Sequence, residues 1–476
     1  MSAPVFVVVG HPNKGKSSIV STLAHDDTVV VAPRPGTTIA ARSFPMRVDD
    51  EVLYTLVDTP GFQRARRTLE WLQREESTAA DHPALVARFV HEHRDGGDFR
   101  DEVELLTPIV EGGGILYVVD GSKPYGPEYE AEMEILRWTG RPSMGLINPI
   151  GSPRYVDEWE AALGQYFRIV RVLDAVQARF DQRVDLLRAF GQMREEWRAP
   201  MDRAVEVLLR DRGRRRRAAA TVITDMLLEM MTLNVGRNLT AHEDAEPYRD
   251  SLEAKYKDRL RELEREARRA VERAYDHHDL SRRESGDAIE RDLFSPETWH
   301  LFGQSKWRLA VLGASSGVVA GGIVDASLAG IGFGVFAGLG AVAGGAVGWQ
   351  AAEWSSSVRV FQLPGMERIG LAGKRVQVGP TSNRNLPYVA LGRARHHHAL
   401  VEGRTHAQRD ELVVDHENEK AGVLNRFPDN IDKRLEKIFH RIRRADGRYD
   451  RAVGQRSEMI EIVDELLESD PTAPSR

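Results

Sequence analysis

The spacing of hydrophobic positions changes several times along the chain, and these changes predict its elements. Up to about residue 180, short runs of β-branched and other apolar residues alternate with helical stretches. The runs cover Val5 to Val9, Val52 to Val57, Ile115 to Val119, Ser143 to Ile147 and Ile169 to Leu173. This alternation predicts βαβ units around a mostly parallel sheet.

A long helical pattern follows, from about residue 179 to residue 291. Its clearest apolar stripe recurs at three- and four-residue steps and comprises Leu252, Tyr256, Leu260, Leu263, Ala267, Val271 and Tyr275. Opposite charges four residues apart, Glu253 with Lys257 and Glu264 with Arg268, predict an exposed face on the same helix.

Residues 309 to 352 are apolar and rich in glycine, and Asp325 is their only charged residue. Beyond them, strand-like runs between residues 358 and 391 are broken by glycine and proline, which predicts a small β element before helical patterns return. The predicted domains are therefore 1–180 (α/β), 181–305 (helical), 306–354 (apolar hairpin), 355–392 (small β element) and 393–476 (C-terminal helices).

Composition narrows the class of protein. The chain has 476 residues, of which 41% are hydrophobic and 29% charged, so several globular domains are expected. A net charge of -6 does not indicate a strongly basic nucleic-acid binder. Cysteine is absent, which excludes disulfides, thiolate metal sites and cysteine nucleophiles and is compatible with a reducing cytoplasm. The first residues lack the features of a signal peptide and are expected to belong to the fold.

The strongest candidate for chemistry is a phosphate-binding loop. Residues 10 to 18 read GHPNKGKSS, which satisfies G-x-x-x-x-G-K-[ST] between a predicted strand and a predicted helix. Gly10 and Gly15 let the backbone curl so that N–H groups point at phosphate oxygens. We expect Lys16 to reach the β- and γ-phosphates and Ser17 to place its hydroxyl on Mg²⁺. A glycine-rich turn without a ligand is the alternative.

A second element supports this assignment. Residues 56 to 61 read LVDTPG, in which a strand delivers Asp58 to the Mg²⁺ shell and Gly61 offers a backbone N–H to the γ-phosphate. Between the two motifs lies RPGTT, where a threonine can close over the metal. Thr37 or Thr38 can take this role, and Thr38 is favoured. The predicted catalytic residues are Lys16, Thr38 and Gly61.

With these motifs, residues 4 to 180 resemble the translation-factor-related GTPases, the group that includes TrmE, Era, EngA and the septins. The resemblance implies a P-loop NTPase with a Ras-like G domain, which binds GTP or GDP with Mg²⁺ and acts as a switch. The whole chain resembles bacterial GTPases that carry an uncharacterised C-terminal domain. The expected nucleotide contacts are Gly10, Asn13, Lys14, Gly15, Lys16, Ser17, Ser18, Thr38, Asp58, Gly61, Asn148 and Asp174.

The resemblance also implies a role for Asn13. Asparagine at this place is associated in the group with a bound K⁺ that assists hydrolysis, and a hydrogen bond that stabilises the loop is the alternative. The water-orienting glutamine of Ras-like proteins would follow Gly61, where this chain has Phe62. We therefore expect slow turnover that relies on another group, such as Gln63, on a cation or on a partner.

Base recognition departs from the group's pattern. Where Asn-Lys-x-Asp is usual, residues 148 to 151 read Asn-Pro-Ile-Gly, so that only the asparagine survives. The later serine-alanine element has Asp174 and Ala175 as its nearest match. A carboxylate on a base edge contributes about 1–3 kcal/mol, and Asp174 is the hypothetical replacement for it.

The apolar segment suggests a membrane. Its glycines recur every four residues and line one helix face, which lets helices approach closely within lipid. The predicted structure is a helical hairpin that turns near Asp325, inserted in the bilayer or buried within a soluble domain or oligomer. The basic run at 212–217 could attract anionic lipid or RNA, or form a solvated helix face.

The histidine and methionine clusters give weaker evidence of function. Adjacent histidines at 277–278 and 396–398 point apart on a helix, which disfavours a shared metal ion, as does the spacing of His91 and His93. Met226, Met230 and Met231 are expected in a core.

The sequence thus predicts a Mg²⁺-dependent GTP-hydrolysing switch coupled to a helical, membrane-associated effector region. Its expected location is the cytoplasm at the inner face of the cell membrane, as a homo-oligomer or with a membrane protein partner. The alternatives are a GTPase of ribosome assembly or RNA, and a non-catalytic nucleotide-binding scaffold.

Overall fold

A computed structural model of the chain describes residues 3–12, 14–24, 41–48, 51–175, 178, 180–240, 242–275, 292–295, 298–299, 302, 358–362, 373–403 and 427–469. Contacts divide it into two compact units, with the main boundary between Arg212 and Gly213. Asn13, Thr37, Thr38 and the apolar segment 309–352 lie outside the described residues, and so do His277 and His278.

The first unit is built on a six-stranded sheet in the order β2-β3-β1-β4-β5-β6, as far as the described residues go. Every pairing is parallel except that of β2 with β3. The strands are β1 (Val5–Val9), β2 (Arg42–Val48), β3 (Glu51–Asp58), β4 (Gly114–Asp120), β5 (Ser143–Asn148) and β6 (Ile169–Val172). The five predicted runs are confirmed as strands, and β2 is an addition to them.

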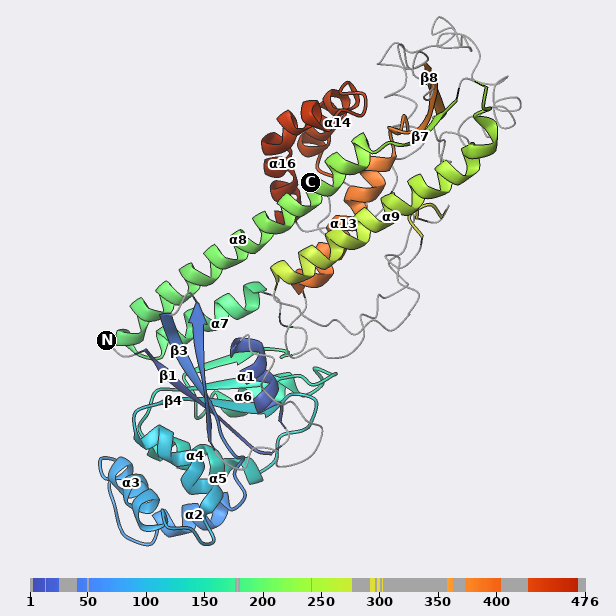
Figure 1. Ribbon diagram of the computed structural model, residues 1–476. Coiled ribbons are helices and arrows are strands. Elements are labelled where there is room, and N and C mark those ends of the chain that lie inside the picture. Colours follow the sequence, from blue (N-terminus) through green and yellow to red (C-terminus); the bar gives the residue numbers. More distant parts are fainter. Residues whose placement is uncertain are drawn as a thin grey trace, which may run out of the picture. The chain divides into compact units, whose positions relative to one another are not determined.

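Helices cover both faces of this sheet (Figure 1). Alternate residues of β1 show why: Phe6 and Val8 face one core, and Val7 and Val9 face the other. The first core also takes side chains from α1, α7 and the start of α8, and the second from α2 to α6. The helices are α1 (Lys16–Ala24), α2 (Ala65–Leu72), α3 (His82–Glu92), α4 (Arg100–Val110), α5 (Glu128–Trp138), α6 (Val156–Leu163), α7 (Phe180–Gln192) and α8 (Glu195–Thr232).

The first compact unit ends beyond residue 180, where the sequence predicts a domain boundary. Side chains of α7 and of the first turns of α8, such as Phe190 and Trp197, pack on the sheet core beside Phe6. Helix α8 itself continues past Arg212, and its second half belongs to the second unit.

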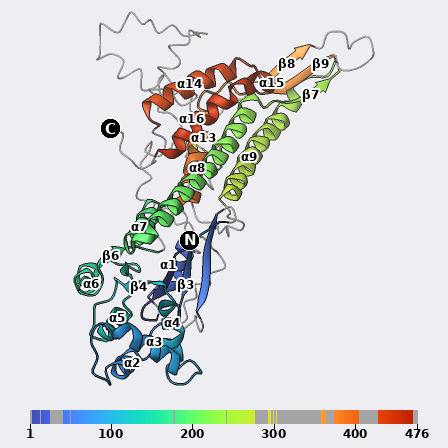
Figure 2. The same ribbon diagram turned by 90° about the vertical axis from the view of Figure 1, so that its left-hand side faces the viewer.

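The second unit is mainly helical, with a small antiparallel sheet in the order β7-β9-β8 among the described residues. The second half of α8 and helix α9 lie side by side, and the strands lie beyond one end of them (Figure 2). The elements are β7 (Val235–Leu239), a 3₁₀ turn (Glu246–Tyr248), α9 (Arg249–Ala274), β8 (Val358–Gln362), β9 (Lys374–Val378), α13 (Leu386–Gly403), α14 (Asp429–Arg443), α15 (Tyr449–Ala452), η5 (Val453–Gln455) and α16 (Arg456–Glu468).

Two features of this unit differ from the expected pattern. Strand β7 lies between two helices in a region expected to be helical throughout, and it pairs with β9. Helix α13 begins at Leu386, inside the range expected to be β. Pro387 stands in its first turn, where the missing N–H of proline costs no helical hydrogen bond.

The helical stripe of α9 is confirmed, since its apolar residues are buried in the core of the second unit together with Met226, Met230 and Met231 of α8. The expectation of an exposed face is wrong at Glu264, which is 6% exposed. Its carboxylate accepts hydrogen bonds from Arg393 and Arg268, both at 2.6 Å. The buried carboxylate is therefore neutralised by two guanidinium groups.

The basic run is partly engaged within the fold. Arg216 is mostly buried and pairs with Asp464 and Glu468 of α16, each at 2.9 Å. Arg217 also approaches Asp464, at 3.7 Å. These contacts give part of the run a role in packing α8 against α16.

Candidate functional site

The loop between β1 and α1 has a backbone that glycine makes possible. Gly10 has φ +141°, and a Cβ on it would lie 2.3 Å from the carbonyl oxygen of Val118 on β4. Gly15 has φ +81°, and a Cβ there would lie 2.2 Å from the side-chain nitrogen of Asn148. A side chain at either position would strain the backbone and collide with its neighbours, so glycine lets the loop pack directly against β4 and β5.

Lys16 begins α1 and is 7% exposed. Its ammonium group donates to the carbonyl oxygens of Gly10 and His11, at 3.1 Å each. Burial lowers the pKa of Lys16 to about 8, and the nearby carboxylates of Asp58 and Glu132 oppose that shift. A cation held within the loop in this way is suited to bind phosphate oxygens.

Two of the three residues predicted to hold Mg²⁺, Ser17 and Asp58, are in contact, and the third, Thr38, lies outside the described residues. Asp58 ends β3 and is 5% exposed, and its Oδ2 accepts a hydrogen bond from Ser17 Oγ at 2.9 Å. A hydroxyl and a carboxylate oxygen side by side match the hard oxygen ligands that Mg²⁺ prefers, so the donor set fits the ion. Thr59 anchors the segment by donating from Oγ1 to the carbonyl of Val8 at 2.8 Å.

Gly61 lies against the phosphate loop. A Cβ at this position would lie 2.6 Å from the backbone nitrogen of Pro12, so the backbone of the Asp-Thr-Pro-Gly motif directly abuts the loop. The next side chain, Phe62, is 2% exposed and belongs to the sheet core. Phe62 therefore anchors this segment in the core.

Asn148 connects three parts of the site. Its Nδ2 lies 3.5 Å from the carbonyl oxygen of Lys14, and its Oδ1 accepts from the backbone N–H of Ala175 at 3.2 Å. Thr22 of α1 also donates to the Ala175 carbonyl, at 2.6 Å. Asn148 thus holds the phosphate loop and the segment after β6 together. Asp174, which directly precedes Ala175, is half-buried.

Three residues of the site were not singled out from the sequence. His11 Nδ1 and Glu132 Oε1 of α5 are 2.9 Å apart, and Tyr117 of β4 donates to Glu132 Oε2 at 2.8 Å. Burial and the Glu132 carboxylate raise the pKa of Tyr117 well above its usual value. His11 carries a local signal, since it lies in the motif, but its partner is too distant in sequence to be found by spacing.

The remaining predicted contacts are less defined. Lys14 is buried, with its ammonium group 5.5 Å from the ring centre of Tyr129, and Ser18 is half-buried in α1. Asn13 and Thr38 lie outside the described residues. In the part of the chain that the structure describes, no group of histidine and acidic side chains is placed to hold a metal ion by itself.

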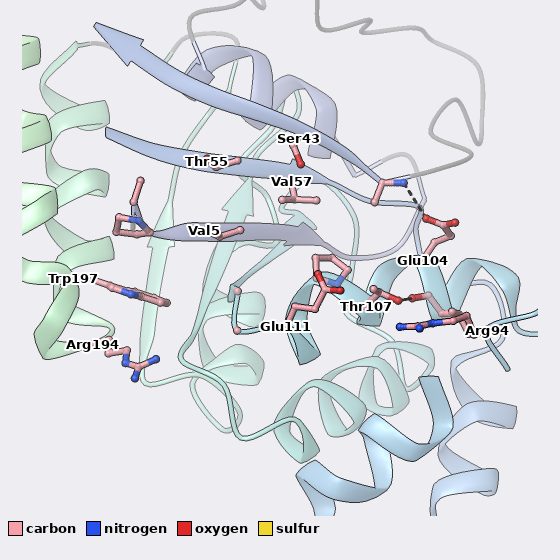
Figure 3. A pocket seen from close by; sticks show the side chains of 17 residues that line it. Val5, Ser43, Thr55, Val57, Arg94, Glu104, Thr107, Glu111, Arg194 and Trp197 are labelled. Carbon is pink, nitrogen blue, oxygen red and sulfur yellow. Dashed lines mark hydrogen bonds between the residues drawn. The ribbon is translucent and has the colours of Figure 1, made fainter. Parts of the chain in front are cut away.

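A cavity of about 760 Å³ lies away from this loop, between α4 and strands β1 to β3 (Figure 3). Val5 at the start of β1 lines it, whereas the phosphate loop follows the other end of that strand. Its charged lining residues include Arg94, Glu104, Glu111 and Arg194. Ala41 and Glu104 also line it, so the cavity reaches the border of the site without including the phosphate loop.

Two family models match successive parts of the chain. A family model described as a domain of unknown function, DUF3482, matches residues 160–468, which is more than half of the chain. The chain belongs to the DUF3482 family. A second model, described as "50S ribosome-binding GTPase", matches residues 5–147 of this DUF3482 member. The N-terminal unit is thus a P-loop GTPase domain, as the sequence predicts, and the resemblance is confirmed.

Similar proteins share the first part of this DUF3482 chain. GTPase Der of Coxiella burnetii is 34% identical over 114 residues, which are 23% of this chain and 25% of that protein. The tRNA modification GTPase MnmE of Thermosipho melanesiensis is 26% identical over 188 residues, 38% of this chain and 42% of that one. The chain thus spans about a quarter of the length of the first of these relatives.

Among solved structures, Era of Aquifex aeolicus is similar at 17% identity, over 57% of this chain and 89% of that one, with a TM-score of 0.28.

Proposed function

We propose that this protein binds GTP and GDP with Mg²⁺ and hydrolyses GTP slowly, as a molecular switch. The observation that carries the proposal is the contact between Ser17 Oγ and Asp58 Oδ2. It brings the phosphate loop and the Asp-Thr-Pro-Gly motif together at the place where Mg²⁺ would bind a triphosphate. The family model of the first 147 residues supports guanine nucleotide as the ligand.

Each residue has a defined part in this function. Loop N–H groups and Lys16 bind the β- and γ-phosphates, Ser17 and Asp58 hold the metal, and the N–H of Gly61 meets the γ-phosphate. Mg²⁺, when bound, neutralises charge on the phosphate oxygens. Phe62 is buried in the core, so hydrolysis relies on another group, such as Gln63, on a K⁺ ion at Asn13 or on a partner.

Phosphate release tests the proposal. The protein should release phosphate from GTP in Mg²⁺ and K⁺, more slowly in Na⁺, and not in excess EDTA. Ser17→Ala should reduce turnover by about tenfold or more, because it removes one of the two described metal-binding side chains. Tight nucleotide binding without any phosphate release, in K⁺ and at high protein concentration, would favour the scaffold alternative.

The effector region is proposed to associate with a membrane through residues 309–352, on the cytoplasmic side. The support is the apolar, glycine-repeating sequence. Within the described residues, no helix combines the length and the hydropathy that crossing a membrane requires. Flotation of the full chain with anionic vesicles, compared with a chain lacking 309–352, tests this proposal, and equal flotation of both would contradict it.

Ribosome association is the second candidate, because the model that matches residues 5–147 is described as ribosome-binding. Alanine substitution of Arg216 or Arg217 is a poor test of it, since both side chains pair with acidic residues of α16. Co-sedimentation of the intact protein with 50S particles, with GDP or a non-hydrolysable GTP analogue, tests it directly.

A further inference from the structure

The segment after Gly61 is gripped by a carboxylate from another helix. Glu102 of α4 is 1% exposed, and its Oε1 accepts from the backbone N–H groups of Gln63 and Arg64, at 2.9 and 2.6 Å. Helix α2 begins at Ala65, and its preceding residue Arg64 provides no side-chain cap. Glu102 therefore satisfies N–H groups that the start of this helix leaves unpaired.

Burial of the Glu102 carboxylate has an energetic cost, which suggests that the residue has a role beyond packing. Glu102 Oε2 is buried and has no hydrogen-bond partner among the described residues. Burial of that oxygen destabilises the fold and offsets part of what the two hydrogen bonds to Oε1 contribute. Outside it, Asp98 pairs with Arg64 at 2.8 Å and Arg67 at 3.1 Å, so the start of α2 is tied twice.

Only a few residues separate the backbone that Glu102 binds from the contact between Gly61 and the phosphate loop. Gly61 abuts Pro12, Phe62 is fixed in the core, and the next two N–H groups are bound by Glu102. The backbone of Gly61 is thus held from the loop side and from the α4 side. Little freedom remains for its N–H group while the Glu102 bonds are made.

The same helix reaches the other flank of the site. Glu104 Oε2 accepts from the backbone N–H of Ala41 at 3.3 Å, a contact drawn in Figure 3. Ala41 directly precedes β2 and follows the RPGTT segment in sequence. Helix α4 therefore bonds to residues that border both motifs expected to respond to the γ-phosphate.

We propose that Glu102 is a positioning residue for GTP hydrolysis. Its two hydrogen bonds hold the start of α2 in the arrangement that presents the Gly61 N–H to the γ-phosphate, and their release accompanies the return to the GDP state. The inference rests on the proposed function. It predicts a loss of turnover without a loss of GDP binding, since GDP has no γ-phosphate for Gly61 to meet.

The test compares Glu102→Ala, which removes the acceptor, with Glu102→Gln, which keeps a carbonyl oxygen at the same place. Glu111→Ala, at the exposed residue that directly follows α4, is the matched control. Glu102→Ala should lower kcat about tenfold while the Kd for GDP changes by less than about twofold. Glu102→Gln should recover most of the turnover, and Glu111→Ala should match the wild type.

Limited trypsin digestion adds a readout that does not need turnover. With a GTP analogue and Mg²⁺ bound, cleavage after Arg64 and its neighbours should be several-fold faster in Glu102→Ala than in the wild type. The inference would be overturned if Glu102→Ala and the wild type were cleaved at equal rates, or if Glu102→Ala lost GDP affinity by the same factor as kcat. A Glu102→Gln variant as slow as Glu102→Ala would also overturn it. A wild type that binds nucleotide without turnover would instead overturn the proposed function, and the cleavage rates would still show whether Glu102 holds the start of α2.

Discussion

At the scale of the residue, Lys16 combines a functional charge with an energetic cost. Its pKa is lowered to about 8 by burial, against an ordinary value of 10.5, so the folded protein binds this proton less strongly than the unfolded chain does. The unfolded chain therefore carries more protons between pH 8 and 10.5, and the free energy of unfolding rises with pH in that window. The full difference corresponds to about 3 kcal/mol.

Lys16→Met should therefore stabilise the nucleotide-free protein at pH 7 by about 1–3 kcal/mol, while it abolishes nucleotide binding. Urea unfolding in EDTA measures the effect. The advantage of the variant should shrink as the pH rises from 8 to 10.5, because the wild-type lysine then loses its charge. A variant that is less stable than the wild type at pH 7 would contradict this account.

Gly61 gives a second prediction at this scale. In Gly61→Ala the new Cβ would meet the backbone nitrogen of Pro12 at 2.6 Å, and the backbone cannot swing aside as a flexible side chain can. We expect GTP turnover to fall about tenfold or more, because the motif must move away from the phosphate loop. Gly213→Ala is the control, since a Cβ there meets nothing within 4 Å. If turnover in Gly61→Ala equals that of the control, Gly61 is not where we place it.

At the scale of the element, α9 and α13 are joined by a buried ion pair. Arg393 is 2% exposed and contacts Glu264 of α9, which burial would otherwise keep neutral. The two arginines beside it hold the pKa of Glu264 below its usual value. Arg393→Met would leave a buried carboxylate with less compensation and should destabilise the second unit by about 3–5 kcal/mol.

Denaturant unfolding of Arg393→Met measures this loss, and the double variant with Glu264→Gln should recover part of it. Lys257→Met is the matched control on the same helix, because the Lys257–Glu253 pair is about one quarter exposed. Its loss should cost less than about 1 kcal/mol. Equal effects of the two single substitutions would show that burial of the Arg393 pair is energetically unimportant.

Elements whose cause is local could be predicted from the sequence, and those with distant causes could not. The five strands β1, β3, β4, β5 and β6 and the stripe of α9 follow from residue spacing alone. Strand β2 was missed because RSFPMRV contains Pro45, which an edge strand tolerates. Strand β7 contains Gly236, which weakens its strand pattern. It is stabilised by pairing with β9, which lies far along the chain. Glu264 was misplaced on the surface because Arg393 is 129 residues away.

The residues of the candidate site also divide into those that local motifs predict and those that depend on distant parts of the chain. That Lys16, Ser17 and Asp58 lie together could be predicted, because the motifs fix their spacing to strand ends. The grip of Glu102 and the contact of His11 with Glu132 require knowledge of which helices pack beside the loop. Asn148 was predicted to contact the nucleotide, and the structure shows its amide group bonded to Lys14 and Ala175.

At the scale of the whole molecule, each compact unit has its own hydrophobic core. We expect thermal unfolding in two calorimetric transitions. GDP with Mg²⁺ should raise the Tm of one transition, by mass action on the unit that binds it, and shift the other much less. Arg393→Met should lower the Tm of the other transition. A single transition that both changes shift equally would contradict the independent unfolding of the two units.

The most direct test of the central claim is the affinity for GDP, measured by titration calorimetry in Mg²⁺ for the wild type and for Lys16→Ala. We predict a weakening of about 100-fold or more, because the variant loses a buried cation that would pair with phosphate. The Glu111→Ala control should bind as the wild type does. Undiminished affinity in Lys16→Ala would show that the nucleotide is not bound at this loop.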